Sequence, residues 1–294
     1  QFSKPFGSVV DPQRVSPRGT GFVKKLYMLE GVSRGSSSLL EENFFKPIDD
    51  RGAIVLKKFE CGQKVFDGAE RVAWTQFILS LLFRHPENVA AVKSRLFDTL
   101  TKTSASAEWR WRRQRKPGDA SSLHRAMHHE IEQDPAQVQR QALQVVADLA
   151  ASERIGTPIA KMFWGSTLLP LSVEPLFSSD RPVLKFGGLD DAGCHILMPI
   201  GPRRIFWAAN SREMANTIMM RAHAPIAGFI NQQTVRRAVR YVYAMSDNRL
   251  TYVQENMSVE PDPSSAEMIA MLDRRSALRR MKRTFNPAGW KAGA

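Results

Sequence analysis

Apolar residues recur at helical spacing through most of the first half of the chain. One stripe begins at Lys46-Pro47 and ends before Gly62, as in a helix with proline in its first turn and glycine after its last. Residues 69–84 are apolar on nearly every side, which predicts a helix at the centre of the fold. Two further helices are expected, one directly after this segment and one after Asp134-Pro135, with Asp134 as its N-cap.

From about residue 161 the pattern changes to short segments rich in β-branched and aromatic residues, separated by glycine, proline and aspartate. Such segments, joined by tight links, predict an antiparallel meander. The expected strands cover residues 162–169, 182–186, 194–198 and 204–208. After them we expect a helix at 211–220 opened by a capping box of Asn210 and Glu213, a helix at 232–245 and a last strand at 250–254.

These periodicities predict an α+β fold over residues 1–260, with a helical N-terminal half packed with a small antiparallel β-sheet from the C-terminal half. Within this single domain, residues 1–35 form a loop-rich lead-in, 39–155 are mostly helical and 161–255 mix strands with helices. Residues 261–294 are expected to form a separate basic helix and tail.

The charge balance adds a functional constraint to this fold. Lys and Arg number 42 against 29 acidic residues, which gives a formal charge of +13. Such a surplus favours nucleic acid or another polyanion as partner. No apolar run reaches the length of a membrane span, and two distant cysteines predict no disulfide framework, so we expect a protein of the reducing cytoplasm.

Residues 101–125 interrupt the helical pattern, and we expect a loop or a poorly packed helix end there. They contain Trp109-Arg-Trp-Arg-Arg-Gln-Arg-Lys116, with five positive charges in eight residues. Cations position phosphates, while indole and guanidinium planes stack on unpaired bases. The alternative is a solvated loop whose tryptophans lie back on the core. The candidate nucleic-acid contacts here are Trp109, Arg110, Trp111, Arg112, Arg113, Arg115 and Lys116.

A second basic segment lies in the tail, where a helix at 273–285 would place its apolar residues on one side and its cations on the other. It is either an arm for nucleic acid, membrane or an acidic partner, or a solvated helix that covers the core. Its candidate contacts are Arg279, Arg280, Lys282 and Arg283.

Sequence patterns for metals and cofactors are weak. His124, His128 and Glu132 would share one helix face, but Arg125 stands where helical metalloproteases carry their acid, and a charged surface helix is the alternative. The sequence contains no phosphate-binding loop, nucleophile elbow or dinucleotide fingerprint. We therefore expect no metal site and no cofactor.

The segment Leu176-Phe-Ser-Ser-Asp-Arg-Pro-Val-Leu-Lys-Phe186 offers the catalytic candidates Ser179 and Asp180. A serine nucleophile needs a base within hydrogen-bond reach, for which His195 would have to approach in the fold. The alternative is structural, because an aspartate at such a place accepts backbone N–H groups, and the residue before Pro182 is held extended.

The order of four segments resembles the bacterial family of domains of unknown function numbered 4238. They are Arg84-His85-Pro86, Phe177-Ser-Ser-Asp-Arg-Pro-Val183, Leu197-Met-Pro-Ile-Gly-Pro202 and Ala238-Val-Arg-Tyr-Val-Tyr243. The resemblance implies a bacterial, cytoplasmic protein and no particular activity, and by comparison with the family we expect its histidine-containing N-terminal segment to be missing here.

The sequence thus favours a basic bacterial protein that associates with nucleic acid. Two alternatives remain, a hydrolase or nuclease with Asp180 in its site and a module that meets an acidic protein through the basic tail.

Overall fold

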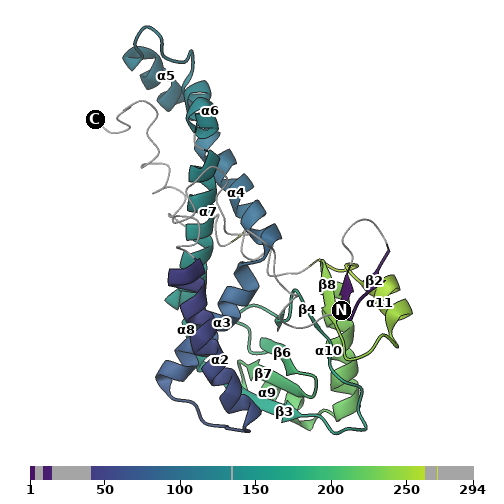
Figure 1. Cartoon of the computed structure of the whole chain (residues 1–294). Coiled ribbons are helices and arrows are strands. Elements are labelled where there is room, and N and C mark those ends of the chain that lie inside the picture. The colour runs from purple at the N-terminus through teal and green to yellow at the C-terminus, as the bar shows by residue number, and fades with distance from the viewer. Residues whose placement is uncertain (4–8, 15–40, 134, 262–269, 271–294) are drawn as a thin grey trace.

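The structure, a computed structural model, describes residues 1–3, 9–14, 41–133, 135–261 and 270. The expected N-cap at Asp134 and the expected tail helix at 273–285 lie outside the described residues and stay predictions. Figure 1 shows a body of helices and small sheets, from which part of the helical half rises as a long arm.

The described chain from residue 41 to residue 161 is almost entirely helical, as predicted for residues 39–155. The bounds of the helices are η2 (Glu41–Phe45), α2 (Lys46–Glu60), α3 (Gly68–Phe83), α4 (Pro86–Thr101), α5 (Ala105–Gln114), α6 (Leu123–Gln133), α7 (Pro135–Ala150) and α8 (Glu153–Lys161). The central helix is α3, where Trp74, Ile78 and Leu79 are buried. A capping box starts it, because Asp67 and Glu70 each accept the backbone N–H of the other.

The sheet with the strand order β3-β7-β6-β5 is antiparallel throughout, as predicted. Its strands are β3 (Phe163–Leu168), β5 (Leu184–Phe186), β6 (His195–Gly201) and β7 (Arg204–Ala209). The predicted meander holds for β5, β6 and β7, whereas β3 pairs with β7 instead of with its neighbour in sequence. On one face Phe206 packs edge-on against Phe59 of α2 and Trp74 of α3, which joins the sheet to the helical half. On the other face Trp207 lies in a separate apolar cluster with residues of α9 (Arg212–Met220) and α10 (His223–Arg237). Since neighbouring residues of a strand point to opposite faces, this sheet is covered on both sides.

A second sheet, in the order β2-β1-β8-β4, joins residues from opposite ends of the described chain. Its strands are β1 (Phe2–Ser3), β2 (Asp11–Pro12), β4 (Ser178–Ser179) and β8 (Tyr241–Tyr243). The α+β fold with a helical N-terminal half and antiparallel sheet is therefore confirmed, with this small sheet added.

Three local predictions were wrong. The helix expected at 232–245 ends at Arg237, and residues 241–243 form β8, because pairing with β1 and β4 decides the structure of this short segment. The strand expected at 250–254 is the helix α11 (Leu250–Asn256), since Val253 and Met257 repeat at helical spacing and are buried.

The capping box predicted at Asn210 and Glu213 is also replaced. Ser211 is the N-cap of α9, and its side chain accepts the N–H of Met214. The Asn210 side chain instead donates to the carbonyl oxygens of Leu189 and Asp191, so it fixes the loop before β6.

Candidate nucleic-acid interface

The Trp/Arg segment forms a helical hairpin at the far end of the arm. Figure 1 shows α5 and α6 at the end of the arm, beyond α4 and α7 and far from both sheets. Of the two expectations for this segment, the loop was wrong, since α5 is a regular helix that starts at the N-cap Ser104, whose side chain accepts the N–H of Ala107. We call residues 105–125 the tip.

Two side chains hold the tip together from inside. Trp111 is buried, and its indole N–H donates to the carbonyl of Ala120 at 3.1 Å. Glu108 turns toward the start of α6 and accepts the backbone N–H groups of Leu123 and His124, each at 3.0 Å. These are N–H groups that a helix start leaves without intrahelical partners, so Glu108 caps α6 from the neighbouring helix.

The pKa of Glu108 reflects this arrangement. Its partial burial acts to raise the pKa, but the backbone bonds from His124 and Leu123, the hydroxyl of Thr103 and the charge of Arg112 together lower it below the ordinary value. The carboxylate is therefore charged at neutral pH, and it is occupied inside the hairpin.

The link between the two helices is a tight turn built on Lys116-Pro117-Gly118-Asp119. The N–H of Asp119 donates to the carbonyl of Lys116, and the N–H of Lys116 donates to the Asp119 carboxylate at 2.6 Å. Gly118 has a φ of 98°, which side chains disfavour, so proline and glycine stand where a type II turn requires them. The second acid of the tip is thus also engaged with the backbone.

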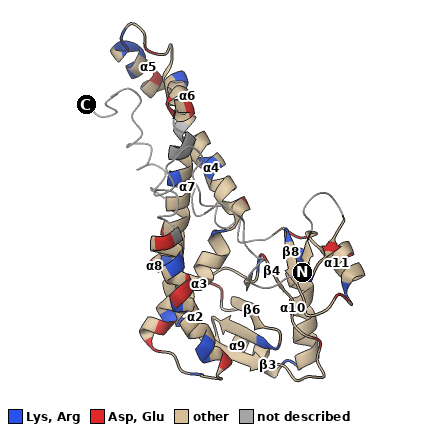
Figure 2. Cartoon of the chain, viewed as in Figure 1, with Lys and Arg blue, Asp and Glu red and all other residues tan. Residues whose placement is uncertain are grey.

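The outer surface of the tip is cationic and carries one exposed indole. Trp109 is 58% exposed, and the guanidinium of Arg113, one turn along α5, lies 4.7 Å from the centre of its ring. Four of the predicted cationic contacts are also exposed there, and they are Arg112, Arg113, Arg115 and Lys116. Figure 2 shows cationic residues at α5. Arg110 is only partly exposed, and Trp111 faces inward.

The structure thus divides the predicted Trp/Arg motif into an inner and an outer part. The two tryptophans differ: Trp111 is buried inside the tip, as the solvated-loop alternative expected, whereas Trp109 is exposed, and its contact with nucleic acid stays a prediction. The contribution of Glu108 was missed, because a single glutamate in a basic run gives no sequence signal of its partner. The tail candidates Arg279, Arg280, Lys282 and Arg283 lie outside the described residues.

The second candidate, Asp180, lies at a corner between β4 and β8. One carboxylate oxygen accepts the N–H of Val239 at 3.1 Å and the other accepts the N–H of Arg240 at 2.7 Å. Burial raises the pKa of Asp180, although these two bonds and the charge of Arg181 act to lower it. Both oxygens are therefore engaged in fixing the backbone, as the structural alternative requires.

Charged side chains from three elements surround this corner. Glu87, in the first turn of α4, lies 3.5 Å from Arg181 and 3.2 Å from Arg240. The base that Ser179 would need is not supplied by His195, whose ring stacks on Phe186 and whose Nδ1 faces the carbonyl of Gly193. Ser179 itself accepts the N–H of Arg181. The cluster ties the base of the arm to the small sheet.

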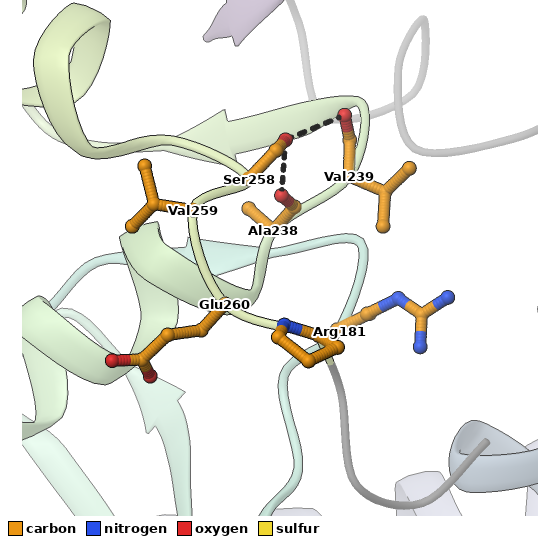
Figure 3. Close-up of a pocket in the computed structure, with 7 residues that line it drawn as sticks. Arg181, Ala238, Val239, Ser258, Val259 and Glu260 are labelled. Carbon is orange, nitrogen blue, oxygen red and sulfur yellow. Dashed lines mark hydrogen bonds between the residues drawn. The ribbon is translucent and has the colours of Figure 1, made fainter. Parts of the chain in front are cut away.

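A pocket of about 410 Å³ lies beside the corner (Figure 3). Its lining residues are Arg181, Ala238, Val239, Ser258, Val259, Glu260 and Pro261. The hydroxyl of Ser258 donates to the carbonyl oxygens of Ala238 and Val239, and Glu260 points away from Arg181 toward its partner Arg236. The polar groups of the pocket are thus mostly bonded to the protein itself.

The histidines of α6 pack as ordinary side chains. The rings of His124 and His128 lie edge to face at 4.7 Å, and Nδ1 of His124 lies 2.9 Å from the carbonyl of Thr101. Within the described ranges, no three His, Cys, Asp or Glu residues come together as a metal ion would require.

The family of the chain follows from a family model. A family model described as "Protein of unknown function (DUF4238)" matches residues 7–248. The chain belongs to this family. The resemblance drawn from the four sequence segments is thereby confirmed, and the DUF4238 match spans the arm, its tip and the Asp180 corner. Searches of curated proteins and of solved structures gave no match. Among the helices described for this DUF4238 protein, none has both the length and the apolarity for a membrane crossing.

Proposed function

We propose that this DUF4238 protein associates with nucleic acid through the outer surface of the tip. The observation that carries the proposal is the separation of charge: four exposed cations face outward, while Glu108 and Asp119 are bonded to backbone N–H groups. Lys and Arg presented in this way neutralise phosphates and release the counterions condensed on them.

A simpler reason for these cations is the helix dipole. Positive side chains in the last turn of a helix are stabilising, and Arg112 and Arg113 stand in the last turn of α5. Arg115 is the C-cap of α5 and shares this explanation, whereas Lys116 lies one residue further, in the turn. The dipole does not require four cations at one helix end, and this accumulation supports a role toward a polyanion.

The proposal is tested by fluorescence anisotropy with a labelled oligonucleotide. Four phosphate contacts predict that the affinity falls by about 50- to 150-fold between about 50 mM and about 200 mM salt. A variant with Arg112, Arg113, Arg115 and Lys116 all changed to Ala should lose most binding at low salt and most of the salt dependence.

A matched variant controls for net charge. Lys57, Arg154, Lys161 and Arg221 are also exposed, and they lie on or beside α2, α8 and α9 in the body (Figure 1). Changing these four to Ala removes the same charge and should leave binding nearly intact. Equal losses in the two variants would overturn the proposal, as would binding to vesicles containing phosphatidylglycerol without binding to the oligonucleotide.

A further inference from the structure

We infer, building on the proposed function, that the tip binds single-stranded nucleic acid and that Trp109 is the surface on which an unpaired base stacks. The starting point is the contrast between two tryptophans on the same helix. Trp111 is 3% exposed and makes a hydrogen bond through its indole N–H, whereas Trp109 is 58% exposed. Burial therefore accounts for Trp111, whereas Trp109 is not buried and keeps much of its surface open to a ligand.

Arg113 restrains the ring of Trp109 on one face. Its guanidinium lies over the ring at 4.7 Å, and Trp109 nevertheless stays 58% exposed. A ring restrained in this way loses less conformational freedom than an unrestrained one when a flat partner stacks on it. Arg113 is also one of the four exposed cations, so a group that can bind phosphate lies next to a ring on which a base can stack.

This combination distinguishes single strands from duplexes. Base-paired DNA or RNA hides the faces of its bases, so a surface for duplexes needs cations and polar groups that read backbone or groove edges. An exposed aromatic ring surrounded by cations is typical of proteins that hold single strands, where bases stack on side chains and the charges follow the phosphates. The tip has both parts within one turn of helix and the link that follows it.

The experiment compares three labelled probes of about 15 nucleotides, a length near the usual site sizes: an oligo(dT) strand, an abasic strand and a duplex. The wild-type protein should bind oligo(dT) about 5- to 150-fold more tightly than the abasic strand, which is the range that loss of one stacked base produces. Trp109→Ala should reduce oligo(dT) affinity to the abasic value and leave binding of the abasic strand unchanged. Trp109→Phe should retain most of the preference.

Phe163 provides the matched control. This aromatic residue of the body is 43% exposed, and the guanidinium of Arg212 lies 5.8 Å from the centre of its ring. Phe163→Ala therefore removes a similar cation–aromatic contact and should leave the affinity for all three probes unchanged. Equal binding of oligo(dT) and abasic strand by the wild type, or tighter binding of the duplex, would overturn the inference while the proposed function stands. Failure to bind any of the three probes at low salt would overturn both.

Discussion

Replacement of Asp180 by alanine separates a structural from a catalytic role for this residue. The substitution removes two hydrogen bonds, at 3.1 Å and 2.7 Å, to the backbone N–H groups of Val239 and Arg240. Hydrogen bonds to a charged group contribute about 1.5–3 kcal/mol each. The raised pKa of Asp180 means that burial disfavours the charged carboxylate by more than these bonds and Arg181 favour it, so the cost of the substitution comes mainly from the N–H of Val239, which loses its partner, since Arg240 is exposed enough for water to replace its bond.

We therefore expect Asp180→Ala to lower the free energy of unfolding by about 2–3 kcal/mol, which is a fall in Tm of roughly 4–10 °C for a chain of this size. Differential scanning calorimetry measures this directly, and urea unfolding gives the free energy. Asp190→Ala is the control, since Asp190 is an exposed acid of a neighbouring turn, and its replacement should stay within about 0.5 kcal/mol of the wild type. An Asp180→Ala protein that melts within about 1 °C of the wild type would refute a structural role and return Asp180 to the catalytic candidates.

Two further predictions concern other parts of the fold. The pKa of Glu108 is lower in the folded protein than its value near 4.5 in the unfolded chain, so the contacts of this carboxylate stabilise the tip above pH 4.5 and are lost as the pH falls through the folded-state pKa. Hydrogen exchange in the first turn of α6 should therefore speed up, beyond the change in its intrinsic rate, between about pH 5 and about pH 3. Glu108→Gln should show fast exchange at neutral pH already, and slow exchange there would contradict the capping role. In the sheet, a Cβ on Gly165 would overlap the ring of Trp207, whereas one on Gly201 meets nothing. Gly165→Ala should therefore lower the free energy of unfolding, measured with urea, by about 1–3 kcal/mol, and a loss no larger than that of Gly201→Ala would show that the Trp207 ring does not lie against Gly165.

The sequence predicted the elements whose own periodicity decides them. The helix around Trp74 is apolar on most sides and is central, and the strands around Ile196 and Phe206 alternate between two buried faces. The secondary structure of a short segment depends on the tertiary contacts that it makes. Tyr241–Tyr243 continues a helical apolar pattern in the sequence, yet it pairs with β1, more than 200 residues away along the chain.

The candidate site was predicted as a set of residues but not as a structure. The sequence identified the cations and tryptophans of the tip, and it could not show that Glu108 reaches the start of α6 or that Asp119 closes a turn. Such side-chain to backbone contacts are not encoded in the spacing of apolar and polar residues, so periodicity cannot predict them. At Asp180 the sequence left two roles open, and only the positions of the N–H groups of Val239 and Arg240 favour the structural one.

The failure of the helical pattern at residues 105–114 has a physical cause that bears on function. A helix normally shows an apolar stripe because one face is buried, but α5 lies at the end of the arm, where there is little protein left to cover it (Figure 1). Trp111 is the residue of this helix that is fully buried, so a single residue, not a stripe, anchors it. Ala107 packs partly against the core and Glu108 caps α6, but the outer positions of α5 are exposed, and burial does not explain the choice of arginine and tryptophan there. The weak helical signal and the concentration of cations around Trp109 are then two results of one arrangement, a helix held out from the body with its surface toward solvent.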